Sequence, residues 1–425
     1  PFRRSHRRRC ARDRPSRAPQ QRREQQRVKL CCKAVCQVLP KRQTAFLCHI
    51  CFRKDFSLLM DKKCTPIANS CRSSLRWLCF TLALVLLLLF LFAIPTAYID
   101  PLFHYHAPLN RYQYPITNER YQNDGIVRTF TYDGIITGTS MTENFKTSEA
   151  NQLFHADFIK VPFAGGRHKE VNSNLRRAYE SGHSIRYIIR GLDPELLILD
   201  KNAVKEDYVY PTYLYNNNPF DDVQYLLNKS IFFDYTLRVP EYTSEGSLTT
   251  TFDQYANWSD SYTYGAASAL AVDSFTENPP PATSLSNEDR ILIQENLQQN
   301  VIDLANEHPE TTFYLFFSPF SIVYWGRLYN GGQITRMLDA EQVAIEALLS
   351  IPNIRLYSFN NNFDLICNLD NYKDYEHYGE WVNTWILEQL VDEHYRLTKD
   401  NYLNYMEDIR TFYTNYDYLS LNNLK

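Results

Sequence analysis

The chain has 425 residues, enough for one large domain of about 250 to 300 residues with attached segments. Its net charge of −3 conceals two opposite parts, because residues 1–76 hold 21 Lys or Arg against 4 Asp or Glu and the remainder holds 24 against 44. Nine of the ten cysteines lie at or before Cys79, so the part of the chain after residue 99 has only Cys367 and an internal disulfide is excluded there.

Residues 1–59 form a basic segment rich in Arg, Gln and Cys, without sustained helical or strand periodicity. We expect this segment to be disordered or not natively translated, because Met60-Asp-Lys-Lys63 is typical of the start of a membrane-anchored protein. A basic tail could also bind nucleic acid or anionic lipid. The stretch Cys48-His-Ile-Cys51 could form half of a zinc site, but a second pair of ligands at suitable spacing is not clear.

The stretch 77–99 contains no charged residue and predicts one transmembrane helix, because about 20 apolar residues cross a bilayer core. The basic side chains that precede it are Lys62, Lys63, Arg72 and Arg76. The positive-inside rule therefore predicts a cytoplasmic tail over 60–76 and an extracytoplasmic domain, with the anchor in the plasma membrane. A cleaved signal peptide is the alternative, but the apolar run is longer than a usual signal core.

Residues 100–125 are predicted as a juxtamembrane segment rich in Pro and aromatic residues. His104 and His106 alternate, so on an extended strand they would share a face and could bind a metal. Packing against the base of the domain is the more usual role for such a pair. No other cluster of His and acidic residues has metal-ligand spacing, so no metal is predicted.

Residues 126–425 are predicted to form one α/β domain, because apolar strands alternate with amphipathic helices. This alternation indicates a parallel sheet with helices on both faces. Strands are expected near 133–138, 158–163, 185–191, 312–317 and 353–358. Helices are expected near 142–152, 169–181, 286–307, 336–350, 379–393 and 401–413.

The alternation of strands and helices is interrupted at about 200–285, where an insertion rich in Tyr, Asn and Pro is predicted. Its aromatic side chains could stack on sugar rings or close over a substrate, or they could form a small core of the insertion itself. The aromatic residues concerned are Tyr208, Tyr210, Tyr213, Tyr215, Tyr255, Trp258, Tyr262 and Tyr264.

Ser140 lies where a predicted strand ends and a helix-compatible run begins, after Gly138 and Thr139. A hydroxyl at the carboxyl end of a strand faces the ligand crevice of an open α/β sheet, and nearby backbone N–H groups could stabilise an oxyanion. An ordinary strand-to-helix turn is the alternative. Near the other end, Asp374-Tyr-Glu-His377 could supply a general base and the carboxylate that orients it, or a helix cap and a surface histidine.

Together these two motifs resemble the SGNH/GDSL hydrolase superfamily, with Gly138-Thr139-Ser140 in place of the usual Gly-Asp-Ser and with Asp374 and His377 in the last block. The resemblance implies a three-layer, flavodoxin-like fold over residues 130 to about 395. It also implies that Gly165 and Gly166 help to form an oxyanion hole. Asp193 stands where the family has an Asn donor, and an ionised carboxylate cannot donate, so Arg167 is considered as a replacement.

The expected function is a membrane-anchored extracytoplasmic serine esterase or O-acyltransferase acting on a cell-envelope glycan or polymer. The layout of one anchor and an external domain is similar to the alginate O-acetyltransferases and the D-alanyl-transfer protein of the teichoic-acid pathway, which implies a bacterial envelope role and a membrane acyltransferase as a further partner. The alternative is a non-catalytic envelope protein of the same fold that binds glycan or that partner.

No cofactor is predicted, since Gly331-Gly332 lacks the Lys-Ser/Thr of a phosphate loop. Nucleic acid is not an expected partner, because the basic tail and the domain are predicted to lie on opposite sides of the membrane.

Overall fold

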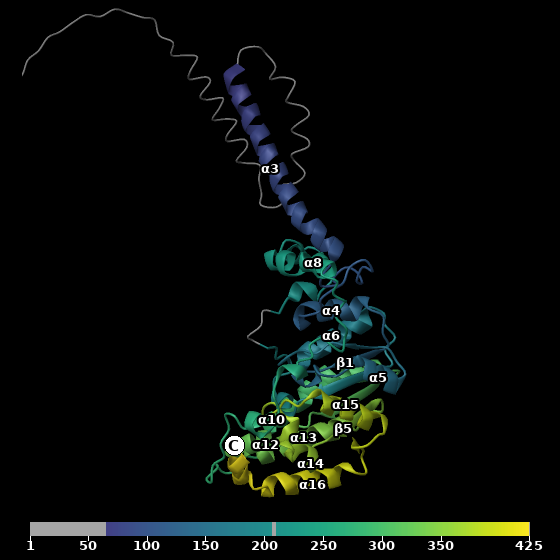
Figure 1. Ribbon diagram of the computed structural model, residues 1–425, viewed down its shortest axis with the longest axis vertical. Helices are drawn as coiled ribbons and strands as arrows, with labels where there is room; N and C mark the ends of the chain where they lie inside the picture. The colour runs from purple at the N-terminus through teal and green to yellow at the C-terminus, as the bar shows by residue number, and fades with distance from the viewer. Residues whose placement is uncertain (1–64, 206–209, 425) are drawn as a thin grey trace, which may run out of the picture. The chain divides into compact units, whose positions relative to one another are not determined.

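The computed structural model describes residues 65–205 and 210–424, with side chains from residue 73 onward (Figure 1). The predictions for residues 1–59, for Cys48 to Cys51 and for Tyr208 lie outside the described residues. Two compact units, Pro1–Ala83 and Leu84–Lys425, divide the chain, and their boundary falls inside helix α3, Thr65–Ile99.

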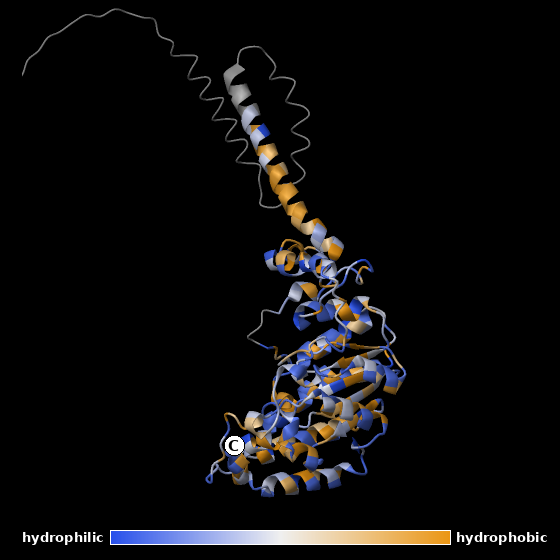
Figure 2. Cartoon of the chain, in the orientation of Figure 1, coloured by the Kyte–Doolittle hydropathy of each residue, from blue (hydrophilic) through white to orange (hydrophobic). Residues whose placement is uncertain are grey.

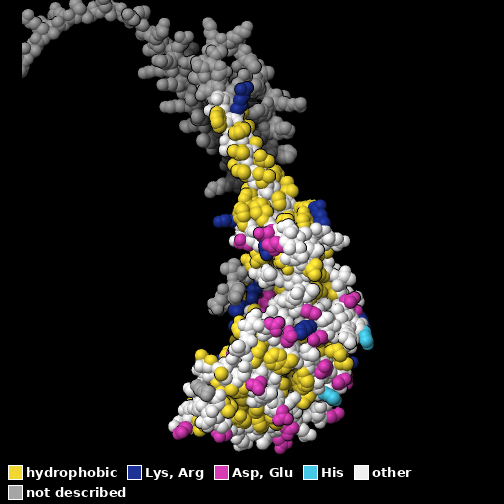
Figure 3. Space-filling view, in the orientation of Figure 1, with side chains coloured by type: hydrophobic (Ala, Val, Ile, Leu, Met, Phe, Trp, Pro, Cys, Tyr) yellow, Lys and Arg dark blue, Asp and Glu magenta, His cyan; other side chains and the backbone are white. Residues whose placement is uncertain are grey.

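Helix α3 contains the apolar stretch Ser73–Ile99, whose 27 residues are long and apolar enough to cross a membrane. Figure 2 shows the middle of this stretch in the hydrophobic colour, and Figure 3 shows hydrophobic side chains along it. None of its most apolar window is buried against protein. Because a helix rises 1.5 Å per residue, 27 residues extend about 40 Å, more than the roughly 30 Å of a bilayer core.

The domain is built on one six-stranded sheet with the order β2-β1-β3-β4-β5-β6. The first five strands of this order are parallel, and β6 is antiparallel to β5. The strands are β1 Gly134–Thr137, β2 Phe158–Lys160, β3 Tyr187–Leu192, β4 Thr312–Phe317, β5 Ile354–Ser358 and β6 Arg396–Leu397. Every residue of β1 and β2 is buried, and since neighbouring side chains point to opposite faces, both faces are covered there. The five predicted strands are confirmed.

Most predicted helices are present, with shifted ends. They are α5 Thr147–Phe154, α6 His168–Glu180, α10 Asn287–Leu297, α13 Ile334–Leu348, α15 Glu380–Val391 and α16 Tyr402–Asn415. The helix expected over 142–152 is split, because the 3-10 turn η1, Ser140–Thr142, precedes α5. The helix expected over 286–307 continues from α10 through the π-helical η6, Gln298–Ile302, into α11, Asp303–Glu307.

Two of the longer helices in the described part of the chain were not predicted, α4 Glu119–Thr129 and α12 Ile322–Asn330. Helix α4 buries Arg120, Gln122, Asn123 and Asp124 in its first half, and its buried apolar side chains, Ile126 and Val127, are adjacent in sequence, so no apolar periodicity is visible. Asp124 accepts from Arg177 of α6 at 2.8 Å and from Arg128 at 2.6 Å. In the first half of α4, these buried ion pairs stand in place of the stripe of apolar side chains by which an amphipathic helix is predicted from sequence.

The predicted juxtamembrane segment 100–125 belongs to the hydrophobic core of the domain. Phe103 and Tyr114 are fully buried, and the Phe103 ring lies 5.1 Å from that of Phe130 in an edge-to-face contact. His104 is buried, and its Nε2 lies 3.2 Å from Asp222. The pair of histidines does not share a ligand, since His106 Nδ1 lies 2.7 Å from the Ala107 carbonyl oxygen.

The insertion between β3 and β4 consists of short elements, of which α8 lies beside the end of α3 in Figure 1. Its Tyr213 and Tyr225 form a small second core with Leu102, Leu214 and Ile231. Part of the aromatic content of the insertion therefore serves its own packing. The short elements of the insertion are η3 Thr212–Leu214, α7 Val223–Leu226, η4 Ile231–Thr236, α8 Arg238–Ser244, η5 Ser259–Ser261 and α9 Ala266–Ala269. The short element η2 Pro194–Ile198 lies between β3 and the insertion. The short elements after β5 are α14 Phe363–Cys367, η7 Leu369–Asn371 and η8 Tyr418–Leu424.

We expect Phe103→Ala to lower the free energy of unfolding by about 3 to 5 kcal/mol, because it removes a fully buried ring from the core. Denaturant titration of the full-length chain in detergent measures this change. Phe220→Ala is the matched control, since the Phe220 side chain is 89% exposed, and it should shift stability by less than about 0.5 kcal/mol. Equal effects of the two substitutions would contradict the placement of segment 100–125 in the core.

Candidate active site

The turn after β1 brings Ser140 to the carboxyl-terminal edge of the sheet. Gly138 has φ +153°, and a Cβ there would meet Thr142 Cγ2 at 2.7 Å and the Gly191 nitrogen at 3.3 Å, so the turn requires glycine. Ser140 is the first residue of η1. The Thr142 N–H donates to the Thr139 carbonyl at 3.0 Å, which closes the turn around the half-buried Ser140.

The Asp374–His377 loop is closed by its own carboxylate. Asp374 Oδ1 accepts from the backbone N–H of Glu376 at 2.9 Å and of His377 at 2.8 Å. The same carboxylate approaches His377 Nδ1, with Oδ2 at 2.9 Å. Because backbone and ring are both held by Asp374, the imidazole has a fixed orientation.

The structure brings Ser140, His377 and Asp374 together although Ser140 and His377 are 237 positions apart. Ser140 Oγ lies 2.8 Å from His377 Nε2, and His377 Nδ1 lies 2.9 Å from Asp374 Oδ2. Hydroxyl, imidazole and carboxylate thus form one continuous line of hydrogen-bond contacts. Such a line allows the imidazole to take a proton from the hydroxyl while the carboxylate stabilises the resulting imidazolium.

The Asp374 carboxylate is suited to remain ionised. Burial alone would raise its pKa, but the side-chain and backbone hydrogen bonds of His377, together with Lys373, hold the pKa well below its ordinary value. Lys373 Nζ donates to Asp374 Oδ2 at 2.7 Å. A negative charge therefore faces Nδ1 of the imidazole at neutral pH.

The glycine loop after β2 lies beside the Ser140 turn, because the Phe163 N–H donates to the Gly138 carbonyl at 2.9 Å. Gly166 uses its own N–H to bind the Phe163 carbonyl at 2.7 Å, so this group is occupied within the loop. Gly165 has φ +57°, and the Arg167 guanidinium donates to its carbonyl at 3.0 Å. Arg167 is thus folded back onto the glycine loop.

Asp193, which was considered with the oxyanion-hole residues, binds the residue before Ser140 and the residue that follows β4. Its carboxyl group accepts from the Thr139 hydroxyl, and the Ser318 hydroxyl donates to it at 2.8 Å. Burial raises the pKa of Asp193, and these two hydrogen bonds oppose the shift. In this arrangement both carboxyl oxygens hold neighbouring side chains, so Asp193 positions the turn that carries Ser140.

Two aromatic residues of the insertion, Trp258 and Tyr262, pack against the loop that carries His377. The Trp258 ring meets the imidazole edge to face, with centroids 5.6 Å apart. Lys373 Nζ lies 4.8 Å from the Trp258 ring centroid and 4.4 Å from that of Tyr262. These cation–π contacts anchor the aromatic cover to the loop that carries the histidine.

Sequence reasoning missed two buried ionisable residues next to the Ser140 turn. Lys160 of β2 donates to the carbonyls of Glu143 and Phe145, the latter at 2.8 Å. Burial, followed by the neighbouring Glu119, raises the pKa of Glu143 well above its ordinary value. The available signal was a single Lys inside the apolar run Phe158 to Phe163, which is unusual for a buried strand.

A polar pocket of about 260 Å³ lies beside these residues. Ala164, next to the glycine loop, forms part of its wall, and so does Trp258, whose ring also contacts His377; none of Ser140, Asp374 and His377 lines the pocket. Trp258 Nε1 donates to Glu143 Oε2 at 2.5 Å. The pocket is lined by Thr117, Asn118, Glu119, Arg120, Tyr121, Glu143, Ala164, Ala256 and Trp258.

Among the described residues, no group of three or more His, Cys, Asp or Glu side chains is arranged to hold a metal ion. His104, one of the two histidines considered as ligands, instead contacts Asp222 and Arg128.

Comparison with known proteins leaves the family open. No protein-family model and no curated protein match the chain. A solved structure from Streptococcus pneumonia, provisionally described as a platelet activating factor, resembles it with a TM-score of 0.32 and 10% identity, covering 65% of this chain and 90% of that one. Similarity at this level carries no argument about fold or activity.

The buried Lys160 predicts a stability that rises with pH. Burial lowers its pKa to about 7 in the folded state, whereas the unfolded chain keeps a value of about 10.4. Between these values the unfolded state binds one more proton, so the free energy of unfolding should increase by up to about 1.4 kcal/mol per pH unit between pH 7 and 9. The charged groups that oppose this lowering are Asp253, Glu143, Glu119 and Glu380.

Denaturant titrations at pH 7, 8 and 9 test this expectation with Lys160→Met, in which the slope should largely vanish. The exposed Lys399→Met is the control and should retain the wild-type slope. A slope that persists in Lys160→Met would assign the pH dependence to another group.

Proposed function

We propose that the chain is a membrane-anchored, extracytoplasmic serine esterase or O-acyltransferase of the SGNH type, acting on a cell-envelope glycan or polymer. The observation that carries the proposal is the line of contacts from Ser140 Oγ to His377 Nε2 at 2.8 Å and from His377 Nδ1 to Asp374 Oδ2 at 2.9 Å.

In the first half-reaction, Ser140 Oγ attacks the ester carbonyl while His377 Nε2 accepts the hydroxyl proton. The tetrahedral intermediate then collapses, the ester C–O bond breaks, and the imidazolium returns the proton to the leaving alcohol. In the second half-reaction, His377 deprotonates water or an acceptor hydroxyl, which attacks the acyl-serine and regenerates Ser140. Water as acceptor gives hydrolysis, and a sugar hydroxyl gives acyl transfer.

The oxyanion of both intermediates would be stabilised by the backbone N–H groups of Ser140 and Gly165. Gly166 is a poorer candidate because its N–H already donates to Phe163. Arg167 would support the loop by holding the Gly165 carbonyl. Asp193, in place of the usual Asn, would act on the site through Thr139.

The order of these groups along the sheet supports the SGNH assignment and its three-layer, flavodoxin-like fold. Ser140 follows β1, the glycine loop follows β2, and Asp193 follows β3. The Asp374–His377 loop comes after β5 and precedes α15. Parallel strands bring these segments to one edge of the sheet, which is where ligands bind in open α/β folds.

The polar pocket beside the site suits a polyhydroxylated acceptor. Carboxyl groups accept hydrogen bonds from sugar hydroxyls, and aromatic faces pack against sugar rings. Glu119, Asn118 and Trp258 offer these groups in a space of about 260 Å³. A single span at Ser73–Ile99, with the amino-terminus in the cytoplasm, would hold this pocket outside the plasma membrane, where a membrane acyltransferase could supply the acyl group.

Labelling of the full-length protein with a fluorophosphonate probe tests the proposed nucleophile. We expect labelling of wild type, none at all in Ser140→Ala, and a rate at least about 100-fold lower in His377→Ala, because the general base is lost. Ser148→Ala is the control, since this exposed hydroxyl donates to Asp253 and should leave labelling unchanged. A folded wild type without labelling would favour the non-catalytic binding protein.

A second test concerns the acceptor pocket. In Glu119→Gln, we expect hydrolysis of 4-nitrophenyl acetate to stay within about 2-fold of wild type, while turnover of acetylated oligosaccharides falls about 10-fold through the loss of one hydrogen bond to a charged group. The amide can still accept from the Ala164 N–H that Glu119 now binds. The exposed Glu310→Gln should change neither rate. Equal losses for both substrates would place Glu119 in the structure of the Ser140 turn.

A further inference from the structure

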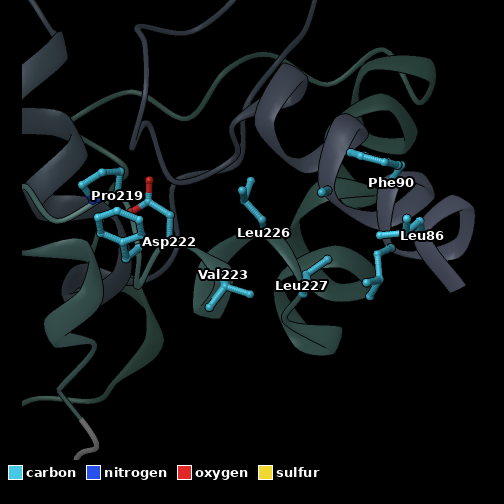
Figure 4. Close-up of a pocket in the computed structure, with 10 residues that line it drawn as sticks. Leu86, Phe90, Pro219, Asp222, Val223, Leu226 and Leu227 are labelled. Atoms are coloured by element: carbon cyan, nitrogen blue, oxygen red, sulfur yellow. The ribbon is translucent and has the colours of Figure 1, made fainter. Parts of the chain in front are cut away.

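An apolar groove of about 400 Å³ lies between the carboxyl-terminal half of α3 and the start of the insertion. Figure 4 shows Val223, Leu226 and Leu227 between the Pro219–Asp222 side and the Leu86–Phe90 side of the groove. Asp222 is the one charged residue in its lining, which consists of Leu86, Leu89, Phe90, Ala93, Pro219, Phe220, Asp222, Val223, Leu226 and Leu227.

Direct contacts hold the insertion against this part of α3. The Phe92 ring centroid lies 4.5 Å from that of Phe232 and 6.1 Å from that of Phe233. Thr96 Oγ1 and Thr236 Oγ1 lie 3.2 Å apart in a buried hydrogen bond. All these residues belong to the unit Leu84–Lys425, so the groove is part of the domain.

The position of the groove along α3 fixes its depth in a bilayer. The candidate span Ser73–Ile99 has 27 residues, whereas about 20 residues fill a hydrocarbon core. Every placement of a 20-residue core within this span includes residues 80–92. If this span crosses the membrane, Leu86, Leu89 and Phe90 lie in hydrocarbon wherever the boundaries fall, so the wall of the groove that α3 provides faces lipid.

The exposed side chains of the insertion agree with this depth. Phe220 is 89% exposed, Val223 52% and Phe233 49%. In water these side chains would form an unfavourable apolar surface, whereas lipid would bury them. The Asp222 carboxylate is satisfied within the domain, since it lies 3.2 Å from His104 Nε2 and accepts from the Tyr105 hydroxyl at 3.0 Å.

We infer that residues 219–237 lie in the outer leaflet of the membrane and that acyl chains of its lipids occupy the groove beside α3. The inference rests on the membrane anchoring proposed above. Exposed charged residues such as Lys229 and Asp234 alternate with the apolar ones, so the segment lies along the interface and does not cross it.

Photocrosslinking tests this contact in the full-length protein reconstituted in phosphatidylcholine vesicles. The probe is phosphatidylcholine with a diazirine in one acyl chain, and peptide mass spectrometry locates the crosslinks. We expect crosslinks within 84–92 and within 219–227. We expect none at Val272, which is 82% exposed and apolar but lies outside the groove.

The outcomes separate the inference from its premise. Crosslinks within 84–92 but none within 219–227 would overturn the inference and leave the span intact, as expected if a second copy or a partner helix occupied the groove. No crosslinks within 84–92 would overturn the span and the inference together. Fluorophosphonate labelling of Ser140 reports separately on the proposed chemistry.

The double substitution Phe220→Glu with Val223→Glu provides a second measurement. We expect crosslinking within 219–227 to fall at least 5-fold relative to that within 84–92, which serves as the internal standard. Both side chains are exposed, so the melting temperature should stay unchanged and the fold can be verified. Val272→Glu is the matched control, and an equal decrease in it would also overturn the inference.

Discussion

The parallel sheet is the constraint on which the site depends, because it brings together the segments in which Ser140 lies within 2.8 Å of His377, across 237 positions of sequence. Parallel strands end at a common edge, so the segments that follow β1, β2 and β3 meet there without being adjacent in the chain. Each group is then fixed locally. Gly138 shapes the turn before Ser140, and Asp374 binds both the backbone and the ring of His377. The line of contacts therefore requires the folded sheet and cannot form in an isolated segment.

Sequence reasoning succeeded where a residue type and its spacing contain the necessary information. The apolar runs of β1 to β5 have turn residues at their ends, and Asp374 and His377 lie within one short loop. It failed where tertiary partners decide the structure. Helix α4 was not predicted because its buried residues include Arg120 and Asp124, which form ion pairs with residues distant in sequence. Strand β6 has only two residues, too few to show an alternation of apolar and polar side chains. No local pattern reveals that Lys160 binds the loop after Ser140.

The ionisable groups around Ser140 are driven in opposite directions by their surroundings. Burial raises the pKa values of Asp193 and Glu143, which favours their neutral acids, and lowers that of Lys160 to about 7. Asp374 is shifted the other way, because its hydrogen bonds with His377 outweigh burial. Hydrogen bonds thus favour the charged form of the carboxylate that faces the imidazole, whereas burial disfavours the charged forms of Asp193, Glu143 and Lys160. This separation is the pattern by which active sites assign acid, base and supporting roles.

The chain path limits how far the site can lie from the end of α3. Asp100 follows α3 directly and accepts from the backbone N–H groups of His104, Tyr105 and His106, so the chain turns back at once onto the domain. Glu119, which lines the polar pocket, comes only 20 residues after Ile99, a distance of at most about 70 Å even for a fully extended chain. Segment 100–117 is folded into the core, so the real distance is shorter. If α3 is the membrane anchor and residues 219–237 lie in the outer leaflet, as proposed above, the pocket can move little relative to the membrane. Under the proposed function, an acceptor polymer would have to present its hydroxyl groups close to the membrane surface, which would favour a nascent or membrane-attached glycan over one deep in the cell wall.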